Sequence, residues 1–257
     1  MKYDLELFAA LNEEYRNKRL VRKPPTYSAA VLKQRGRSRV KGLAARFGIA
    51  GKRLLEIGCG RGETCYAFAT QHGCSVVGVD ITEYPQWKAH QSPTLSLVRQ
   101  DLSQEPVALA PSQFDFAYSN AVWEHVRHPF AMLKAVHALL KPGGTFYIVA
   151  NLHRGPKASH RYREVFFPWP HLLFTDEVFE RYYASIGKAP ARAAWVNRLS
   201  IADYFLYFDL VGFERAEITY STTPIDEQFY QRFSDILERY PRYDLERDFL
   251  HAVLIKR

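Results

Sequence analysis

The chain has 257 residues, of which 47% are hydrophobic and 24% charged, as is ordinary for a globular protein. This length can bury a sizeable core without disulfides or structural metals. No apolar run approaches the roughly 18 residues of a membrane span, and the first residues lack the apolar core of a secretory signal. The three cysteines, Cys59, Cys65 and Cys74, fit neither a disulfide framework nor a zinc signature. We therefore expect a cytoplasmic protein with no membrane span and no metal site, and exclude secreted disulfide-rich and disordered classes.

The net charge of +8 is concentrated at the N-terminus. Residues 1–53 hold fourteen Lys/Arg against four acidic residues, a net charge of +10, so the rest of the chain carries a net −2. Such a segment could bind the phosphates of a nucleic acid, or it could simply be a solvated helix face. We favour the solvated face, because nothing here resembles a nucleic-acid-binding module.

The N-terminal half predicts two helices followed by alternating strands and helices. Apolar residues at helical spacing predict a helix over 4–20, and a second helix follows the basic stretch 35–39 and ends at Gly48. Strands are then expected at 53–57, 75–79, 95–98, 114–119 and 145–149, with helices at 63–71 and 130–140. Short strands alternating with helices indicate right-handed crossovers and a parallel sheet.

Residues 151–212 interrupt this alternation. A long loop over 153–174 precedes a helix capped by Thr175 and closed by Gly187, and an apolar helix follows over 201–211. A loop of this length in a compact domain is usually functional. A strand at 214–220, a helix at 226–238 and a strand at 249–255 complete the chain. We predict a basic N-terminal helical arm over 1–37 and a main domain over 38–257, with a lid or acceptor region at about 151–212.

A glycine-rich turn follows the first strand of the alternating region. In Glu56-Ile57-Gly58-Cys59-Gly60-Arg61-Gly62, glycines recur every second residue between a strand and a helix. Glycine allows a tight turn and close approach of a ligand to the backbone. The dinucleotide fingerprint requires a different spacing, G-x-G-x-x-G, so a nicotinamide oxidoreductase is disfavoured. An acid at Glu56 would repel a pyrophosphate and instead suits a ligand with a cationic end.

Polar residues also follow the next three strands. Asp80 ends the second strand and can accept the hydroxyls of a ribose, Asp101 follows the third, and Asn120 follows the fourth. All lie at the carboxyl edge of the predicted sheet, where open α/β folds bind ligands.

Five motifs in this order resemble those of class I S-adenosylmethionine-dependent methyltransferases, most closely the small-molecule branch often called methyltransferase type 11. They are residues 56–62, Gly78-Val79-Asp80, Gln100-Asp101, Asn120-Ala121-Val122-Trp123-Glu124-His125-Val126 and Leu140-Lys141-Pro142-Gly143-Gly144. The resemblance is close over about 40–150 and looser over 213–257. It implies an α/β fold with a Rossmann-like, seven-stranded, mostly parallel sheet whose last strand is antiparallel.

The resemblance also implies S-adenosyl-L-methionine as cofactor, S-adenosyl-L-homocysteine as product, and roles for particular residues. Glu56 and the backbone of Gly58, Cys59, Gly60 and Gly62 would hold the methionine part. Asp80 would hold the ribose with Ile81 against the adenine, while Asp101 and Leu102 would hold the base and Asn120 and Ala121 would flank the donor. Trp123 and His125 would face the acceptor.

Two further segments are candidates for the acceptor site. The aromatic segment 167–174, with Trp169 and His171, resembles a pattern in methyltransferases linked to bacterial surface sugars and secondary metabolites. Histidine suits a general base near neutral pH, and His125 or His153, which follows the fifth strand, could serve as that base.

We therefore expect methyl transfer to an oxygen or nitrogen of a small molecule, such as a sugar or natural-product intermediate. Two alternatives stay open: an RNA or protein methyltransferase that uses the basic arm, and a non-catalytic scaffold that binds the cofactor or nothing. Nucleic acid is thus a possible partner that we do not favour, and the sequence does not indicate an oligomeric state.

Overall fold

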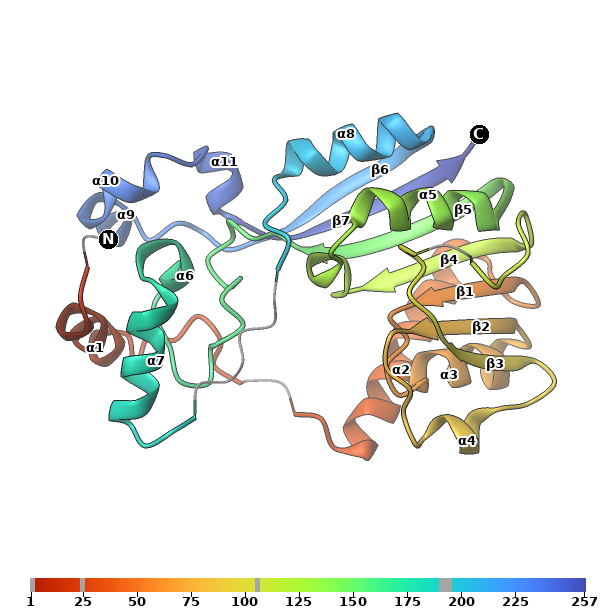
Figure 1. Cartoon of the computed structure of the whole chain (residues 1–257), viewed down its shortest axis with the longest axis horizontal. Helices are drawn as coiled ribbons and strands as arrows, with labels where there is room; N and C mark the ends of the chain where they lie inside the picture. The colour runs from red at the N-terminus through yellow and green to blue at the C-terminus, as the bar shows by residue number, and fades with distance from the viewer. Residues whose placement is uncertain (1–2, 24–25, 105–106, 190–195) are drawn as a thin grey trace. The chain divides into compact units, whose positions relative to one another are not determined.

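The computed structural model describes residues 3–23, 26–104, 107–189 and 196–257, and Figure 1 shows its elements. The strands are β1 (Arg53–Ile57), β2 (Ser75–Asp80), β3 (Leu95–Arg99), β4 (Phe114–Asn120), β5 (Leu140–Asn151), β6 (Phe213–Thr222) and β7 (Arg247–Lys256). The α-helices are α1 (Leu5–Glu14), α2 (Ala29–Phe47), α3 (Glu63–His72), α4 (Trp87–His90), α5 (Pro129–Leu139), α6 (Pro170–Leu173), α7 (Asp176–Ser185), α8 (Ile201–Val211), α9 (Glu227–Arg232), α10 (Ser234–Leu237) and α11 (Arg242–Leu245), and a 3₁₀ helix, η1, spans Trp123–His125. Within the described ranges, no helix combines the length and apolar character needed to cross a membrane.

The strands form one seven-stranded sheet in the order β3-β2-β1-β4-β5-β7-β6. The pairs β1–β2, β1–β4, β2–β3 and β4–β5 are parallel, and the sheet becomes antiparallel at its last strands. The predicted Rossmann-like, mostly parallel sheet is therefore confirmed. Since β2 and β4 lie on opposite sides of β1, the order reverses at β1, which is where open α/β sheets bind ligands.

Alternate side chains of the central strands pack against helices on opposite faces of this sheet. Tyr147 of β5 contacts Phe47 of α2. Its neighbour Phe146 contacts Phe213, which in turn contacts His137 of α5. Successive residues of a strand point to opposite faces, so α2 covers one face and α5 the other.

The chain divides into two compact units. The helical unit comprises Met1–Pro25, Asn151–Ile201 and Tyr220–Leu250, and the sheet unit comprises Thr26–Ala150, Ala202–Thr219 and His251–Arg257. Helix α2 runs without a break through residues 37 and 38, between which the sequence predicts the boundary of the arm. The division of the chain into an arm, a main domain and a lid with separate functions stays a prediction.

An aromatic core holds the helical unit together. Phe8 of α1 is fully buried, and its ring lies 5.1 Å from Phe167, 4.9 Å from Phe174 and 5.1 Å from Phe179. The side chain of Asn12 is buried beside them, where it donates to the carbonyl of Glu164 and accepts from the N–H of Phe166. Helix α1 is thus packed against residues 164–179 by apolar burial and by satisfied polar groups.

Several element boundaries differ from the sequence predictions. The first helix ends at Glu14 rather than at residue 20, because 16–19 offer mainly charged and polar side chains with no apolar face to bury. Helix α2 begins at Ala29, capped by Ser28, so the basic stretch 35–39 lies inside it. The predicted helix at 226–238 is two short helices, α9 and α10, and the predicted loop 153–174 contains α6. Thr175 caps α7 by accepting from the N–H of Val178, as predicted.

Candidate active site

The candidate site lies at the carboxyl edge of the sheet unit, where β1, β2, β3 and β4 end. The parallel register places Ile57 beside Val79 and Ser119, so the residues that follow these strands emerge side by side. They line a cavity of about 870 Å³, the glycine-loop cavity. Eight residues predicted to form the site share its wall: Gly58, Gly60, Asp80, Ile81, Asp101, Leu102, Ala121 and His125.

A second cavity of about 450 Å³, the helix-side cavity, lies between the glycine loop (residues 58–62) and α2. It shares Gly58, Gly60 and Tyr84 with the first cavity. Glu56, Cys59 and Asn120, the other polar and small residues predicted near the donor, line this one. Gly62 and Trp123 line neither cavity.

The glycines of the loop have separate reasons to be glycine. Gly58 has φ +72°, and a Cβ there would collide with the side chain of Val122. Gly62 has φ +85°, and a Cβ would lie 2.7 Å from Leu97. Gly60, with φ +53°, has no atom within 4 Å of the position of a Cβ, although it lines both cavities. Gly58 and Gly62 thus permit close packing of neighbouring side chains, whereas Gly60 leaves open space where a ligand can approach the backbone.

Two side chains fix the position of Gly60. The N–H of Gly60 donates to Asp80 Oδ2 at 2.9 Å, and its carbonyl accepts from the indole N–H of Trp87 at 2.7 Å. Asp80 Oδ1 also accepts from the N–H of Thr82 at 3.0 Å. Each carboxylate oxygen can accept more than one hydrogen bond, so Asp80 can still receive the hydroxyls of a ribose.

Glu56, on β1, carries a buried carboxyl group that meets the first turn of α3. The thiol of Cys65 lies 2.9 Å from its Oε2 and donates to it. Burial, which penalises the charged form, raises the pKa of Glu56 to about 7, and the hydrogen bonds together with the nearby Arg39 oppose that rise. A cationic ligand group would favour the ionised carboxylate.

The residues that follow β2 and β3 form polar and apolar parts of the cavity wall. Asp101 Oδ1 accepts from the N–H and hydroxyl of Ser103 at 2.9 and 2.6 Å, and Oδ2 accepts from Gln104. Ile81, after the end of β2, is 64% exposed although it is apolar, and Leu102 is buried. An exposed isoleucine in a cavity offers a flat ring an apolar contact.

His125 is the one predicted general base that lines the glycine-loop cavity. It ends η1, with its side chain about one third exposed, and its Nε2 lies 4.0 Å from Oε1 of the buried Glu124. This separation is longer than a hydrogen bond, so it does not by itself fix the orientation of the ring. Trp123 is 1% exposed, and its ring packs 5.6 Å from that of Phe146.

The other predicted acceptor residues belong to the helical unit. Burial, together with the cations Arg198 and Arg154, lowers the pKa of His153 to about 4. Burial also lowers the pKa of His171 to about 3, and its Nε2 bonds to the carbonyl of His153. Trp169 is 1% exposed and its indole donates to the carbonyl of Leu245. All three have structural partners here, and their role toward an acceptor stays a prediction.

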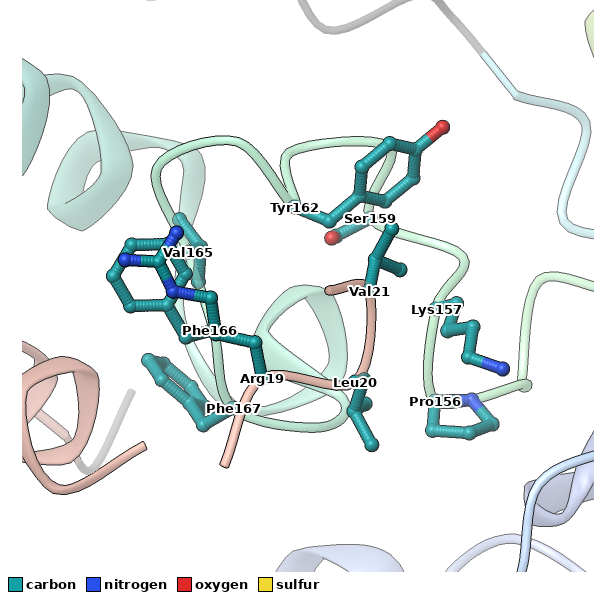
Figure 2. Close-up of a pocket in the computed structure, with 10 residues that line it drawn as sticks. All are labelled: Arg19, Leu20, Val21, Pro156, Lys157, Ser159, Tyr162, Val165, Phe166 and Phe167. Atoms are coloured by element: carbon teal, nitrogen blue, oxygen red, sulfur yellow. The ribbon is translucent and has the colours of Figure 1, made fainter. Parts of the chain in front are cut away.

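The helical unit also contains a small cavity between residues 19–21 and 156–167 (Figure 2). The guanidinium of Arg19 lies 3.9 Å from the centre of the Phe166 ring, and the Lys157 ammonium is held by Thr223 and Asp248. The free space is about 10 Å³, which is room for about one water molecule. This cavity is too small for a substrate.

One wall of the site was not predicted from the sequence. Leu32, Arg35 and Arg39 of α2 line the helix-side cavity, and Trp87 of α4 holds the glycine loop. In the sequence these arginines belong only to a basic stretch. Their spacing, with Arg35 and Arg39 one helical turn apart, is the signal that could have placed them on one face.

Comparison with known proteins identifies related sequences and folds. Residues 29–186, more than half of the chain, match the family model described as "Methyltransferase domain". Ubiquinone biosynthesis O-methyltransferase of Pseudomonas aeruginosa (strain LESB58) is 39% identical over 124 residues, which are 47% of this chain and 53% of that protein. The chain thus spans about half the length of the curated relatives that it matches.

Solved structures share the fold at low identity. An S-adenosylmethionine-dependent methyltransferase from Mesorhizobium loti aligns with TM-score 0.54 and 21% identity, covering 84% of this chain and 96% of its own. A putative S-adenosylmethionine-dependent methyltransferase from Listeria monocytogenes aligns with TM-score 0.58 and 17% identity, covering 87% and 99%. These similarities support the same sheet architecture.

Proposed function

Because this chain belongs to the methyltransferase domain family, we propose that it transfers a methyl group from S-adenosyl-L-methionine to a hydroxyl oxygen of a small molecule. Family membership confirms the predicted resemblance, the enzyme class and the cofactor. The observation that carries the proposal is the glycine-loop cavity, whose wall combines Gly60, Asp80, Asp101 and His125.

The choice of oxygen as acceptor atom is supported by the sequence relatives. The relative from Pseudomonas aeruginosa is an O-methyltransferase, and the residues that match the methyltransferase family model include the site. Oxygen is therefore favoured over nitrogen, the other acceptor atom expected from the sequence. The acceptor is a small molecule in this proposal.

The two cavities fit the proposed cofactor. Gly60 leaves open space beside its backbone, Asp80 retains acceptor capacity for ribose hydroxyls, and Glu56 offers a carboxylate to an ammonium group. Ile81 and Leu102 supply apolar walls for an adenine, and Asp101 offers a hydrogen-bond acceptor to its amino group. When bound, the cofactor supplies a methyl group that its sulfonium has already activated for displacement.

The protein's own task is then alignment and removal of a proton. Alignment of reactants can contribute up to about 7–11 kcal/mol in favourable cases. We assign His125, which lines the glycine-loop cavity, as the base that accepts the hydroxyl proton at its imidazole. Proton transfer of this kind contributes about 10²–10⁴-fold. His153 is the weaker candidate, because its lowered pKa makes it a poor proton acceptor at neutral pH.

The experiment that tests this proposal measures methyl transfer directly. The full chain is incubated with S-adenosyl-L-methionine carrying a labelled methyl group and with a panel of small hydroxyl and amine compounds. The proposal predicts label in a methyl ether together with equimolar S-adenosyl-L-homocysteine. Label only in amines would reassign the acceptor atom, and label only in added RNA or protein would favour the alternative that uses the basic arm. Cofactor binding without any transfer would favour the scaffold alternative.

A further inference from the structure

The helix-side cavity carries more positive charge than a methionine group requires. Three guanidinium groups, those of Arg35, Arg39 and Arg61, line it. Two acids lie in the same wall: Glu56 accepts from Cys65, and Glu63 lies 3.8 Å from His90. With both acids ionised, the wall carries a net charge of +1. The methionine part of the cofactor brings one ammonium and one carboxylate, so it leaves this excess positive charge in place.

Arg39 is the arginine that contacts the first turn of α3. Its Nη1 lies 3.4 Å from Thr64 Oγ1, to which it donates, and its charge acts on Glu56. It is therefore the natural partner for a carboxylate that accompanies the ammonium bound at Glu56. Within the ranges that the structure describes, neither Arg35 nor Arg61 forms an ion pair.

Arg35 is accompanied by an exposed aromatic ring. Its guanidinium carbon lies 5.8 Å from the centre of the Tyr27 ring, and Tyr27 is 59% exposed. Leu32 lies in the same wall. An apolar surface next to an uncompensated guanidinium suits a ligand that has a flat or apolar body and a negative group.

The backbone explains why Arg35 reaches this position. Gly36 of α2 lies so close to the start of α3 that a Cβ there would be 2.8 Å from the carbonyl oxygen of Glu63. The two helices therefore cross at close range, and Arg35 and Arg39, one turn apart, both line the cavity. Arg37, on the other side of α2, is exposed and lines neither cavity.

We propose that the helix-side cavity holds, beside the methionine part of the cofactor, the anionic end of the methyl acceptor. The acceptor bears a carboxylate or phosphate that pairs with Arg35, its apolar body lies against Tyr27 and Leu32, and its hydroxyl extends past Gly58 and Gly60, which line both cavities, toward His125. This inference rests on the proposed function, since it assigns an acceptor class to the same site. A planar or cyclic hydroxyl compound with one anionic substituent meets these requirements.

The test compares matched probes on the full chain saturated with S-adenosyl-L-homocysteine. The probes are 4-hydroxyphenylacetate, which carries a carboxylate, phenyl phosphate, and the neutral 4-ethylphenol, each titrated by calorimetry. We expect at least one anionic probe to bind about tenfold or more tightly than 4-ethylphenol, and the two anionic arms distinguish a carboxylate from a phosphate. Arg35→Gln should remove this preference without changing the affinity for S-adenosyl-L-homocysteine, and the control Arg37→Gln should leave both unchanged.

Three results would overturn the inference in different ways. Equal binding of all three probes, or binding of none, would show that the cavity does not select an anionic acceptor. Loss of S-adenosyl-L-homocysteine affinity in Arg35→Gln, equal to its loss of anion affinity, would assign Arg35 to the cofactor instead. Failure of the wild type to bind S-adenosyl-L-homocysteine would contradict the proposed function itself, and this inference with it.

Discussion

The indole N–H of Trp87 donates to the carbonyl oxygen of Gly60 at 2.7 Å, and so connects a short helix to the loop that lines both cavities. Trp87 is 4% exposed, so this donor lies where water cannot easily replace it. Together with Asp80, it holds both backbone polar groups of Gly60. We infer that the shape of the loop depends on α4 as well as on β1 and α3.

Replacing Trp87 by Phe should weaken cofactor binding while the chain still folds. Phe retains most of the packing but leaves the Gly60 carbonyl without its donor, a loss of about 1 kcal/mol in a typical hydrogen bond. We expect the dissociation constant for S-adenosyl-L-homocysteine, measured by calorimetry, to rise about fivefold. Tyr243→Phe, which removes a hydroxyl bond to Tyr220 in the helical unit, is the control. Equal affinities in all three proteins would show that the Trp87 bond does not position the loop.

Alanine substitutions at Gly58 and Gly60 should have different consequences. At Gly58 the added methyl group meets Val122, so Gly58→Ala should lower the free energy of unfolding, by about 1–3 kcal/mol as overpacking usually does. At Gly60 the methyl group enters open cavity space. Gly60→Ala should therefore lower the free energy of unfolding less than Gly58→Ala does, and should weaken cofactor binding more.

Chemical unfolding and calorimetry on both variants separate these effects. If Gly60→Ala bound S-adenosyl-L-homocysteine as the wild type does, the space beside Gly60 would not be cofactor space.

The stability of the protein should depend on the protonation of Glu56. Its pKa in the folded chain, about 7, lies above the ordinary value of 4.5, so the folded chain binds this proton more tightly than the unfolded chain. The stabilisation is therefore fully present below pH 4.5 and is lost as pH rises through 7, by about 3 kcal/mol in all. We expect urea unfolding to show this decline in the wild type and a smaller decline in Glu56→Gln, which cannot ionise. Equal declines in the two proteins would assign the pH dependence to other groups.

Glu56 should also couple the binding of S-adenosyl-L-homocysteine to the release of a proton. An ammonium group at Glu56 favours the ionised carboxylate, so S-adenosyl-L-homocysteine binding at about pH 6 should release a proton. Calorimetric titrations in buffers of different ionisation enthalpy measure the number of protons released. Release of no proton in the wild type, or of as many in Glu56→Gln, would place the ammonium group elsewhere.

Replacing His125 should lower the rate of transfer without lowering cofactor affinity. His125→Gln removes the proton acceptor from the glycine-loop cavity, and we expect kcat to fall by about 10²–10⁴-fold. His128→Gln is the matched control, since His128 is exposed three residues further along and lines neither cavity. A His125→Gln enzyme with unchanged kcat would remove His125 from the mechanism.

Sequence reasoning was most informative where local chemistry and strand ends coincide. The glycine loop and Asp80 follow buried strands, and parallel strands present their carboxyl ends at one edge, so their convergence follows from the pattern itself. The mostly parallel sheet could also be predicted, because short strands alternate with helices along the chain.

The sequence could not place residues whose role depends on packing between distant segments. Trp87 belongs to a four-residue helix with no periodic signal, and Arg35 reaches its cavity only because Gly36 lets α2 approach α3. Trp169 lies in a predicted loop, where an aromatic side chain suggests an acceptor contact, whereas its indole is buried against Leu245. Aromatic residues in a loop predict burial as readily as recognition.

Calorimetric titration of S-adenosyl-L-homocysteine into the wild type and into Asp80→Asn tests the central claim most directly, with Asp209→Asn, an exposed ion-pair residue of α8, as control. The cofactor assignment predicts binding to the wild type and to Asp209→Asn, and at least about tenfold weaker binding to a folded Asp80→Asn, because charge-assisted hydrogen bonds are lost. Equal affinity in all three proteins, or no binding to the folded wild type, would contradict it.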